Sequence, residues 1–543
     1  MPETIFIGVA WPYVNGPIHI GGVTGAYLPA DIFARYHRLV GNRVLMVSGS
    51  DEHGAPVTIR ADRDGTTPGA IADLYHGLCV DNFARLGLSY DLYTRTGTAN
   101  HERVVQDMFL KLYEQGNIYP QTTDAAYCPR DQRFLPDRYI EGTCPYCGYT
   151  QARGDQCDNC TKPLDPVDLA DARCKLCGTR PEMRPTEHFF LRLTAFQSRL
   201  EAWLAPQTHW KPGVLGQALG MLREGLKDRP ITRDILWGVP IPLPGYEQKR
   251  IYVWFDAFIG YWSASIEWAE QRGEPDAWKP FWHDPSTKAY YFLGKDNIFF
   301  HTIMWPMVLL AYGGLNMPHD VPANAYLNDE RGDKMSKSRA QGVLLPEYLD
   351  YYDPDALRYL FTAIMPETRD ASFAPDELLR RNNDELVATY GNFVHRVLTF
   401  VWRNFEGVVP PAGATTPADD TALAACRGIF DDVGTAIASC QFKEGLRLIM
   451  GLAAHGNRYL DEQAPWRQIK SDRARCATTL HVCLQMIGAL RTVTQPYLPF
   501  SSQRLHAMLG GDGDVGAMGW GQTPLSDGQA LREPTPLFKK LED

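Results

Sequence analysis

Long apolar runs are absent from this 543-residue sequence. No segment approaches the roughly 18 uninterrupted apolar residues that a membrane-spanning helix requires. The N-terminus also lacks a basic region followed by an apolar stretch and a cleavage site, which is the pattern of a secretion signal. We therefore expect a cytoplasmic protein without a membrane partner.

An excess of basic residues is missing as well, since Asp and Glu number 64 against 54 Lys and Arg and the net charge is −10. This balance argues against a protein that coats nucleic acids without discrimination, but not against one specific RNA held by a local basic face. Repeats and low-complexity segments are also absent. The length exceeds what a single core supports, and the apolar content of 44% is that of a multidomain globular protein.

Cysteine is scarce outside one short region. Seven of the twelve cysteines lie between Cys128 and Cys177, and six of these form three Cys-x-x-Cys pairs. In a reducing cytosol this spacing indicates metal ligation rather than disulfides. Two of the pairs have the spacing of a zinc knuckle, which would hold a structural zinc ion with four thiolates: Cys144, Cys147, Cys157 and Cys160.

The third pair, Cys174 and Cys177, has no use in that first site. Cys128 is followed three residues later by Asp131, and zinc also accepts a carboxylate oxygen. These four residues could complete a second site, weaker because a carboxylate is a harder ligand than a thiolate. The alternative is a decayed site with a buried Cys128 and two free thiols. We therefore expect one or two zinc ions per chain.

The order of strand-like and helix-like segments predicts an α/β, doubly wound, Rossmann-like nucleotide-binding domain. A zinc-binding insertion is expected to interrupt this domain, and an all-α helical bundle is expected to follow it. Helical periodicity over 376–405, 419–438, 442–463 and 472–495 indicates the bundle. The expected divisions are the first catalytic half at 1–116, the insertion at 117–230, the second catalytic half at 231–322, a lysine-loop region at 323–375 and the bundle at 376–543.

The second half of the predicted sheet is expected to contain three apolar segments. We interpret residues 237–242 and 251–256 as strands, and residues 289–293 as another. A helical pattern then covers residues 298–312 before the lysine-rich loop.

Two short motifs in the α/β part are suited to nucleotide binding. Residues 12–22 (PYVNGPIHIGG) lie between an apolar strand pattern and a helical pattern, an arrangement that places a phosphate on a helix N-terminus. Residues 334–338 (KMSKS) offer two ammonium groups on a loop of short side chains. A Lys/Ser loop alone is most often a solvated turn, so the interpretation depends on the two motifs together.

In this order the motifs resemble the signatures of the class I aminoacyl-tRNA synthetases, a His-Ile-Gly-His element and a Lys-Met-Ser-Lys-Ser loop. Four segments narrow the resemblance to the methionyl-tRNA synthetase family: residues 10–16 (AWPYVNG), 50–54 (SDEHG), 252–257 (YVWFDA) and 300–306 (FHTIMWP). The resemblance covers nearly the whole chain. It implies an enzyme that ligates L-methionine to its tRNA with ATP, through a methionyl-adenylate.

Amino-acid activation requires a carboxylate to attack the α-phosphorus of ATP, and positioning and charge stabilisation carry such chemistry. The catalytic candidates are His19, a donor to phosphate oxygens, and Lys334 and Lys337, which can neutralise the departing pyrophosphate. Mg²⁺ is expected to accompany the ATP. Together with positions that the resemblance supplies, the expected ATP-binding residues are Pro12, Gly21, Gly22, Gly294, Asp296, Lys334 and Lys337.

The resemblance also implies a methionine pocket in which Asp51 holds the substrate ammonium. An aromatic lining suits a thioether, because each contact of sulfur with a ring contributes a fraction to about 1.5 kcal/mol. The expected methionine-binding residues are Trp11, Tyr13, Asp51, Trp254, Ala257, Tyr261, Phe300, His301 and Trp305.

A tRNA anticodon is the partner that the resemblance implies for the bundle. Asn392 and Arg396 are four residues apart and share one helix face, and Trp466 follows a helix-breaking proline. Splayed RNA bases stack on aromatic rings and arginine planes, which is the use the family makes of this arrangement. The insertion would help to place the acceptor end. An appended oligonucleotide-binding barrel, with which the family often dimerises, is not seen, so we expect a monomer.

Two positions depart from the family pattern. Gly22 replaces the last histidine of the first signature, and the loss of one such donor can cost on the order of 10²–10³ in rate. Phe258 stands where a smaller residue is expected. The alternatives are therefore a weakened or inactive RNA-binding paralogue and a class I synthetase for another amino acid. The retained Asp51 and Asp296 argue against the first, and the pocket residues argue against the second.

Overall fold

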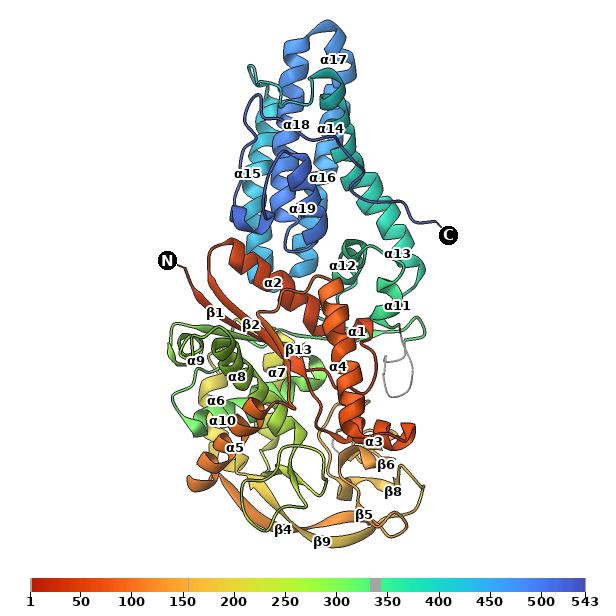
Figure 1. Ribbon diagram of the computed structural model, residues 1–543, viewed down its shortest axis with the longest axis vertical. Helices are drawn as coiled ribbons and strands as arrows, with labels where there is room; N and C mark the ends of the chain where they lie inside the picture. Colours follow the sequence, from red (N-terminus) through yellow and green to blue (C-terminus); the bar gives the residue numbers. More distant parts are fainter. Residues whose placement is uncertain (1, 155, 333–342, 543) are drawn as a thin grey trace.

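The computed structural model describes residues 2–154, 156–332 and 343–542 (Figure 1). A parallel five-stranded sheet forms the centre of the α/β part, in the order β14-β13-β1-β2-β3. Its strands are β1 (Thr4–Val9), β2 (Arg43–Ser50), β3 (Leu92–Arg95), β13 (Lys288–Gly294) and β14 (Ala323–Asn324). Strands β2 and β3 extend the sheet on one side of β1, and β13 and β14, which come later in the chain, extend it on the other side. The strand order therefore reverses between β1 and β13, and ligands bind at the carboxyl ends of the strands at such a point.

Strand β1 is buried along almost its whole length. Ile5 lies in register with Val44 of β2 and Lys288 of β13. A continuous apolar sequence is what a central parallel strand covered on both faces requires, so the predicted doubly wound fold is confirmed. The accompanying helical segments are α1 (Ile20–Gly22), η1 (Val23–Tyr27), α2 (Leu28–Leu39), α3 (Ala55–Asp64), α4 (Pro68–Arg85), α5 (Ala99–Glu114), α8 (Val253–Gln271), α9 (Lys279–His283), η5 (Lys295–Asn297), η6 (Phe300–Met304) and α10 (Trp305–Tyr312).

The prediction of strands at 237–242 and 251–256 is wrong. Strands β11 (Thr232–Arg233) and β12 (Arg250–Ile251) form only a two-stranded ribbon outside the main sheet, and helix α8 begins at Val253. Most of the first thirteen residues of α8 are buried, so their sequence is apolar around the whole helix. A short apolar run of this kind does not distinguish a buried helix from a buried strand.

The insertion is built from small antiparallel sheets, at the end of the molecule opposite the bundle (Figure 1). A long β4–β9 ribbon forms its base. The elements of the four-stranded sheet are β10 (Arg229–Pro230), β9 (Glu182–Leu191), β4 (Ile118–Cys128) and β5 (Arg133–Phe134). A three-stranded sheet contains β7 (Ala152–Arg153), β6 (Ile140–Thr143) and β8 (Ala170–Cys174), and helices α6 (Gln197–Leu204) and α7 (Pro212–Glu224) follow.

The C-terminal part is helical, as predicted. Before the predicted bundle come α11 (Leu345–Leu349), α12 (Pro354–Ala363) and the short strand β16 (Ala371–Ser372). The helical segments that follow are α13 (Asp376–Arg380), η8 (Arg381–Gly391), α14 (Asn392–Asn404), α15 (Pro417–Ala438), α16 (Phe442–Gln463), α17 (Pro465–Ser471), α18 (Arg473–Val493), α19 (Pro499–Met508) and η9 (Val515–Met518). Helices α15, α16 and α18 pack on one another to form the bundle. Across the described ranges, no helix combines the length and apolarity needed to cross a membrane.

Candidate active site

A cleft of about 550 Å³ opens where the strand order reverses. The cleft is lined by the segment that follows β1 and by residues 294–297, at the carboxyl end of β13 and just beyond it. Arg138, Arg153 and Asp158 of the insertion also face it. Nine of the predicted catalytic, ATP-binding and methionine-binding residues line the cleft: Trp11, Pro12, Tyr13, His19, Gly21, Gly22, Trp254, Gly294 and Asp296.

His19 caps the first helical turn of this segment. Its Nδ1 accepts a hydrogen bond from the backbone N–H of Gly22, with a distance of 3.2 Å. A neutral ring that accepts at Nδ1 carries its proton on Nε2, where it can be donated to a phosphate oxygen. A Cβ on Gly21 would lie 3.0 Å from the His19 ring, so glycine is required for this close approach.

Lys334 and Lys337 of the lysine loop lie outside the described residues. The chain that leaves the loop is joined to the first motif by two backbone hydrogen bonds. The N–H of Ile20 donates to the carbonyl of Val343 at 3.0 Å, and the N–H of Leu345 donates to the carbonyl of Ile18 at 2.8 Å. The segment that follows the lysine loop in sequence, residues 343–345, therefore lies beside the first motif.

Aromatic rings extend from the cleft wall into the core. The ring of Trp254 stacks on Phe300 with centroids 4.0 Å apart, and Tyr13 meets Trp254 edge-on at 6.0 Å. Phe300 belongs to η6, a π-helical turn of the kind that is frequent at functional sites. An added Cβ on Gly260 of α8 would lie 2.8 Å from the Trp11 ring, so Trp11 packs directly on this helix.

A polar pair lies deeper in the same wall. His301 Nδ1 lies 3.0 Å from the carbonyl oxygen of Asn297, and its Nε2 lies 2.8 Å from the Tyr261 hydroxyl. The carbonyl can only accept, so Nδ1 carries the proton and Nε2 accepts from the hydroxyl. Burial lowers the pKa of His301 to about 4, and the ring is therefore neutral at pH 7.

The other predicted pocket residues are buried beneath the cleft. Ala257 lies on α8, while Trp305 packs against Phe258 with ring centroids 5.1 Å apart. Phe258, the second departure from the family pattern, thus fills the space beside Trp305. These placements bring Trp11, Tyr13, Trp254, Tyr261, Phe300 and His301 to one wall and leave Trp305 behind it.

Asp51 is buried next to this wall, at the end of β2. Its backbone pairs with the chain after β1, because the N–H of Val14 donates to the Asp51 carbonyl at 3.1 Å. The side-chain Oδ1 atom has no hydrogen-bond partner among the described residues. Burial, reinforced by the charge of Asp256, raises the pKa of the Asp51 carboxyl well above its ordinary value. A bound ammonium group would satisfy this oxygen and stabilise the ionised form.

A buried histidine–carboxylate cluster near Asp51 was not found from the sequence. Asp256 Oδ2 lies 2.6 Å from His53 Nδ1, and Asp256 also contacts His101 Nε2. Burial alone would raise the pKa of Asp256, but the two histidines lower it to about 2. His53 and Asp256 stand inside two of the motifs described above. They are 203 positions apart in sequence, so no spacing pattern could join them.

Comparison with known proteins decides the family. The model of the class I tRNA synthetases (M) matches residues 5–398, and that of the anticodon binding domain of methionyl tRNA ligase matches residues 409–543. The methionine–tRNA ligases of Thermomicrobium roseum and Dehalococcoides mccartyi are 51% and 53% identical, covering 100% of this chain and 97% and 98% of their own. The chain belongs to the methionyl-tRNA synthetase family.

The structure agrees with this membership. The crystal structure of Mycobacterium tuberculosis methionyl-tRNA synthetase bound by methionyl-adenylate matches with a TM-score of 0.82 at 25% identity, covering 99% of this chain and 100% of that one. The chain is therefore a methionine–tRNA ligase of the class I synthetases, as predicted. The comparisons support neither the inactive paralogue nor a synthetase for another amino acid.

Two side-chain clusters in the insertion of this synthetase could each hold a metal ion, with ligand atoms within 4.8 Å of one another. Sγ atoms lie 3.9 Å apart between Cys144 and Cys160, and 3.6 Å apart between Cys147 and Cys157. A zinc ion with Zn–S bonds of about 2.3 Å places its tetrahedral ligands about 3.8 Å apart. A disulfide would need about 2.05 Å. The first predicted set therefore fits zinc.

The second cluster joins the remaining predicted ligands. Cys128 Sγ lies 3.5 Å from Cys177 Sγ, and Asp131 Oδ2 lies 3.0 Å from Cys174 Sγ. The Asp131 carboxylate thus occupies the position of a fourth ligand. This donor set, three sulfur atoms and one oxygen, also fits a tetrahedral zinc ion.

The free end of the bundle gathers the predicted tRNA-binding residues. Arg396 donates to Asp461 at 2.6 Å, and its guanidinium carbon lies 5.5 Å from the ring centroid of Trp466. Asn392 is exposed one turn earlier on α14. Ala464 takes a left-handed conformation and Pro465 starts a new helix, which leaves the ring of Trp466 41% exposed.

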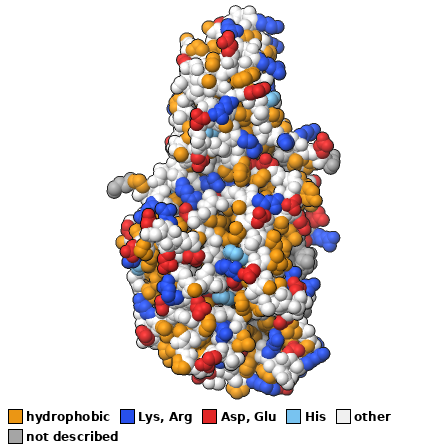
Figure 2. All heavy atoms as spheres, viewed as in Figure 1, with side chains coloured by type: hydrophobic (Ala, Val, Ile, Leu, Met, Phe, Trp, Pro, Cys, Tyr) orange, Lys and Arg blue, Asp and Glu red, His pale blue; other side chains and the backbone are white. Residues whose placement is uncertain are grey.

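Basic side chains surround this end despite the net charge of −10. Arg467, Lys470 and Arg473 are exposed on α17 and at the start of α18. Lys and Arg side chains gather along one edge of the bundle's free end in the space-filling view (Figure 2). Such a local basic face can bind the phosphates of one RNA.

Proposed function

We propose that the cleft at the reversal of the strand order is where methionine is activated, and that the free end of the bundle reads the anticodon. The observation that supports this most is the convergence of separate segments: chains after β1, after β13 and from α8 meet at one cleft. The catalytic chain would comprise the regions 1–116, 231–322 and 323–375, with the insertion at 117–230 and the anticodon-binding part at 376–543.

In this proposal the nucleotide lies along the first motif. Gly21 and Gly22 allow the phosphates to approach the backbone, and Nε2 of His19 donates to a phosphate oxygen. Asp296 accepts from the ribose, next to Gly294, and Pro12 borders the nucleotide. Lys334 and Lys337 neutralise the pyrophosphate as it leaves, together with the Mg²⁺ that enters with ATP. The hydrogen bonds between residues 18–20 and 343–345 support a lysine loop held at this cleft.

The methionine pocket would use the aromatic wall. Asp51 pairs with the substrate ammonium, which its unsatisfied Oδ1 favours. The Trp254–Phe300 stack and Tyr13 contact the side chain, and the rings of Tyr261 and His301, which are hydrogen-bonded to each other, border its sulfur atom. Trp11 lines the cleft beside these rings, and Ala257 and Trp305 shape the pocket from behind.

The specificity of the cleft can be measured without tRNA. We expect exchange of labelled pyrophosphate into ATP with L-methionine and with none of the other nineteen amino acids. Exchange with a different amino acid would contradict the methionine pocket, and an absence of exchange with all of them would contradict the activation chemistry.

For the insertion we propose a structural zinc ion at Cys144, Cys147, Cys157 and Cys160, and a second one at Cys128, Asp131, Cys174 and Cys177. All twelve cysteines are free of disulfides, which suits a reducing compartment, and we infer a cytoplasmic location. We further infer that the synthetase acts as a monomer, with tRNA, ATP and methionine as its partners. Sedimentation of the purified chain tests the monomer.

A further inference from the structure

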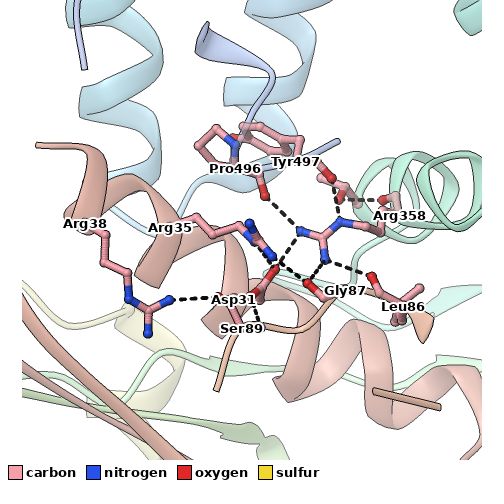
Figure 3. A network of polar contacts seen from close by, with 10 residues as sticks. Asp31, Arg35, Arg38, Leu86, Gly87, Ser89, Arg358, Pro496 and Tyr497 are labelled. Carbon is pink, nitrogen blue, oxygen red and sulfur yellow. Dashed lines mark hydrogen bonds and ion pairs between the residues drawn. The ribbon is translucent and has the colours of Figure 1, made fainter. Parts of the chain in front are cut away.

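Helix α12 lies between the catalytic part and the bundle, and its Arg358 is fully buried (Figure 3). The Nη2 atom of Arg358 forms an ion pair of 2.7 Å with Asp31 on α2. Neither side chain of this pair is exposed to solvent. A buried charge pair is retained only where further hydrogen bonds satisfy both partners.

The remaining donors of Arg358 reach backbone carbonyls from two other parts of the chain. Its Nε donates to Tyr497 at 2.7 Å and its Nη2 donates to Pro496 at 2.9 Å, just beyond α18 of the bundle. Its Nη1 donates to Leu86 at 3.2 Å, at the end of α4 in the catalytic part. One guanidinium thus joins α2, α4 and the bundle, with α12 carrying it.

The carboxylate of Asp31 also accepts hydrogen bonds from several donors besides Arg358. It accepts from the backbone N–H of Ser89 at 2.7 Å and from Nε of Arg35 at 2.9 Å. Burial alone would raise the pKa of Asp31, but the charges of Arg35 and Arg358 hold it well below its ordinary value. The carboxylate therefore remains ionised, and the junction keeps its full set of contacts at pH 7.

Helix α18 connects this junction to the free end of the bundle. It has 21 residues and so spans about 30 Å. Near its start, Cys476 and Thr479 donate to Pro465 and Gln468, the residues that flank Trp466 and Arg467 on α17. Near its end, the carbonyls of Pro496 and Tyr497 accept from Arg358. A rigid helix thus lies between Trp466 and the junction.

The other side of the junction leads to the cleft. Helix α12 follows the segment 343–345, which is hydrogen-bonded to residues 18–20 beside His19. A second side chain of α12, Asp355, accepts from the N–H of Ser501 at 2.5 Å, so α12 contacts the bundle at two points. The same helix is therefore tied both to the bundle and, through its preceding segment, to the first nucleotide-binding motif.

We propose that Arg358 is a positioning residue that fixes the bundle relative to the cleft, so that a tRNA bound at Trp466 is oriented for charging. The proposal rests on the anticodon role proposed above for Trp466. An apolar interface would permit the two parts to slide. The planar guanidinium of Arg358 has acceptors on separate segments, so all its hydrogen bonds can form in only one relative position of these segments. Arg358 does not line the cleft, so it should act on tRNA charging and not on methionine activation.

The test compares pyrophosphate exchange, charging of full-length tRNA and charging of a minihelix in the variants R358K and R358Q. Lysine keeps the charge but cannot reach the same set of acceptors, and it serves as the variant that folds if glutamine does not. We expect pyrophosphate exchange to be unchanged in both. The kcat/KM for full-length methionine tRNA should fall by roughly tenfold or more, since mutations that uncouple distant sites have effects of this order. Charging of an acceptor-stem minihelix without an anticodon should be unchanged.

The matched control is R85Q. Arg85 forms an exposed ion pair of 2.7 Å with Asp350, which joins α4 to the chain before α12 in the same region. An exposed pair contributes little, so all three reactions should stay within about twofold of the original chain.

Two results would overturn the proposal. The first is unchanged charging of full-length tRNA by both variants. The second is an equal fall in exchange, minihelix charging and tRNA charging, which would make Arg358 a folding residue only.

Trp466→Ala separates this proposal from the anticodon assignment. If Arg358 acts by orienting Trp466, the W466A/R358K double variant should charge tRNA no more slowly than the slower single variant. If the fold-loss of tRNA charging in the double variant equals the product of the two single losses, an action of Arg358 through Trp466 is contradicted. Normal tRNA charging by W466A alone would refute the anticodon assignment, while a selective loss in R358K would still support the junction.

Discussion

Gly22 stands where the family's first signature ends in histidine, and its surroundings explain the glycine. A Cβ at this position would lie 3.1 Å from Cε2 of Tyr27. The Tyr27 ring is buried and packs on Phe83 with centroids 4.9 Å apart, so it has little room to move aside. The site is therefore packed around glycine.

We expect Gly22→His to slow activation instead of restoring a phosphate contact. The larger side chain would have to displace the Tyr27 ring or the backbone next to His19, so pyrophosphate exchange should fall, and overpacking should also cost about 1–3 kcal/mol of folding stability. Gly22→Ala adds only the Cβ and should give a smaller loss of the same sign. Faster exchange in G22H would show that Tyr27 yields, and that the missing histidine limits the rate.

Asp51 gives methionine binding a dependence on pH. In the empty pocket burial holds the pKa of Asp51 well above its ordinary value, so the protonated form, which cannot pair with an ammonium group, persists to a higher pH than for an ordinary carboxyl. Binding selects the ionised carboxylate and must release the proton, and affinity should therefore weaken as pH falls. Titration calorimetry in buffers of different ionisation enthalpy should show this proton release. Its absence across the neutral range, or its persistence in D51N, would contradict the assignment.

At the scale of elements, the first cysteine cluster belongs to the wall of the cleft. Cys157 and Asn159 line the cleft, and Gln156 between β7 and this cluster donates to the backbone carbonyl of Asp296 at 3.1 Å. Metal at this site would hold that wall in place. The residues of the second cluster do not line the cleft.

Metal analysis of protein purified without chelator tests both clusters. We expect about two zinc ions per chain, and about one in Cys174→Ser and in Cys144→Ser. Exchange activity should persist in C174S and fall in C144S, since only the first cluster supports the cleft. A content near one that C174S does not alter would rule out the second site.

The helices could be predicted from the sequence more reliably than the strands. Motifs that are contiguous in sequence could be predicted more reliably than contacts between residues distant in sequence. The bundle helices follow from amphipathic periodicity, whereas the segment at 251–256 was misassigned because α8 is buried on all sides. The site motifs are contiguous in sequence and could be predicted. The Asp256 cluster and the Arg358 junction could not, because their partners are brought together only by the tertiary fold; Asp31 and Arg358 are 327 positions apart.

The whole molecule is elongated, with the bundle extending from the α/β part (Figure 1). The cleft and Trp466 lie in different parts, and the Arg358 junction with α18 connects these parts. Activation and anticodon reading should therefore be separable by mutation, although both contribute to one reaction.

Trp466→Ala tests whether activation and anticodon reading are separable, with tRNA charging and pyrophosphate exchange measured on the same preparation. Removal of a base-stacking platform should weaken transition-state stabilisation in aminoacylation by about 1–3 kcal/mol. Exchange with methionine and ATP alone should not change, because the ring is remote from the cleft. A parallel fall of both activities, or full tRNA charging by the variant, would contradict the account.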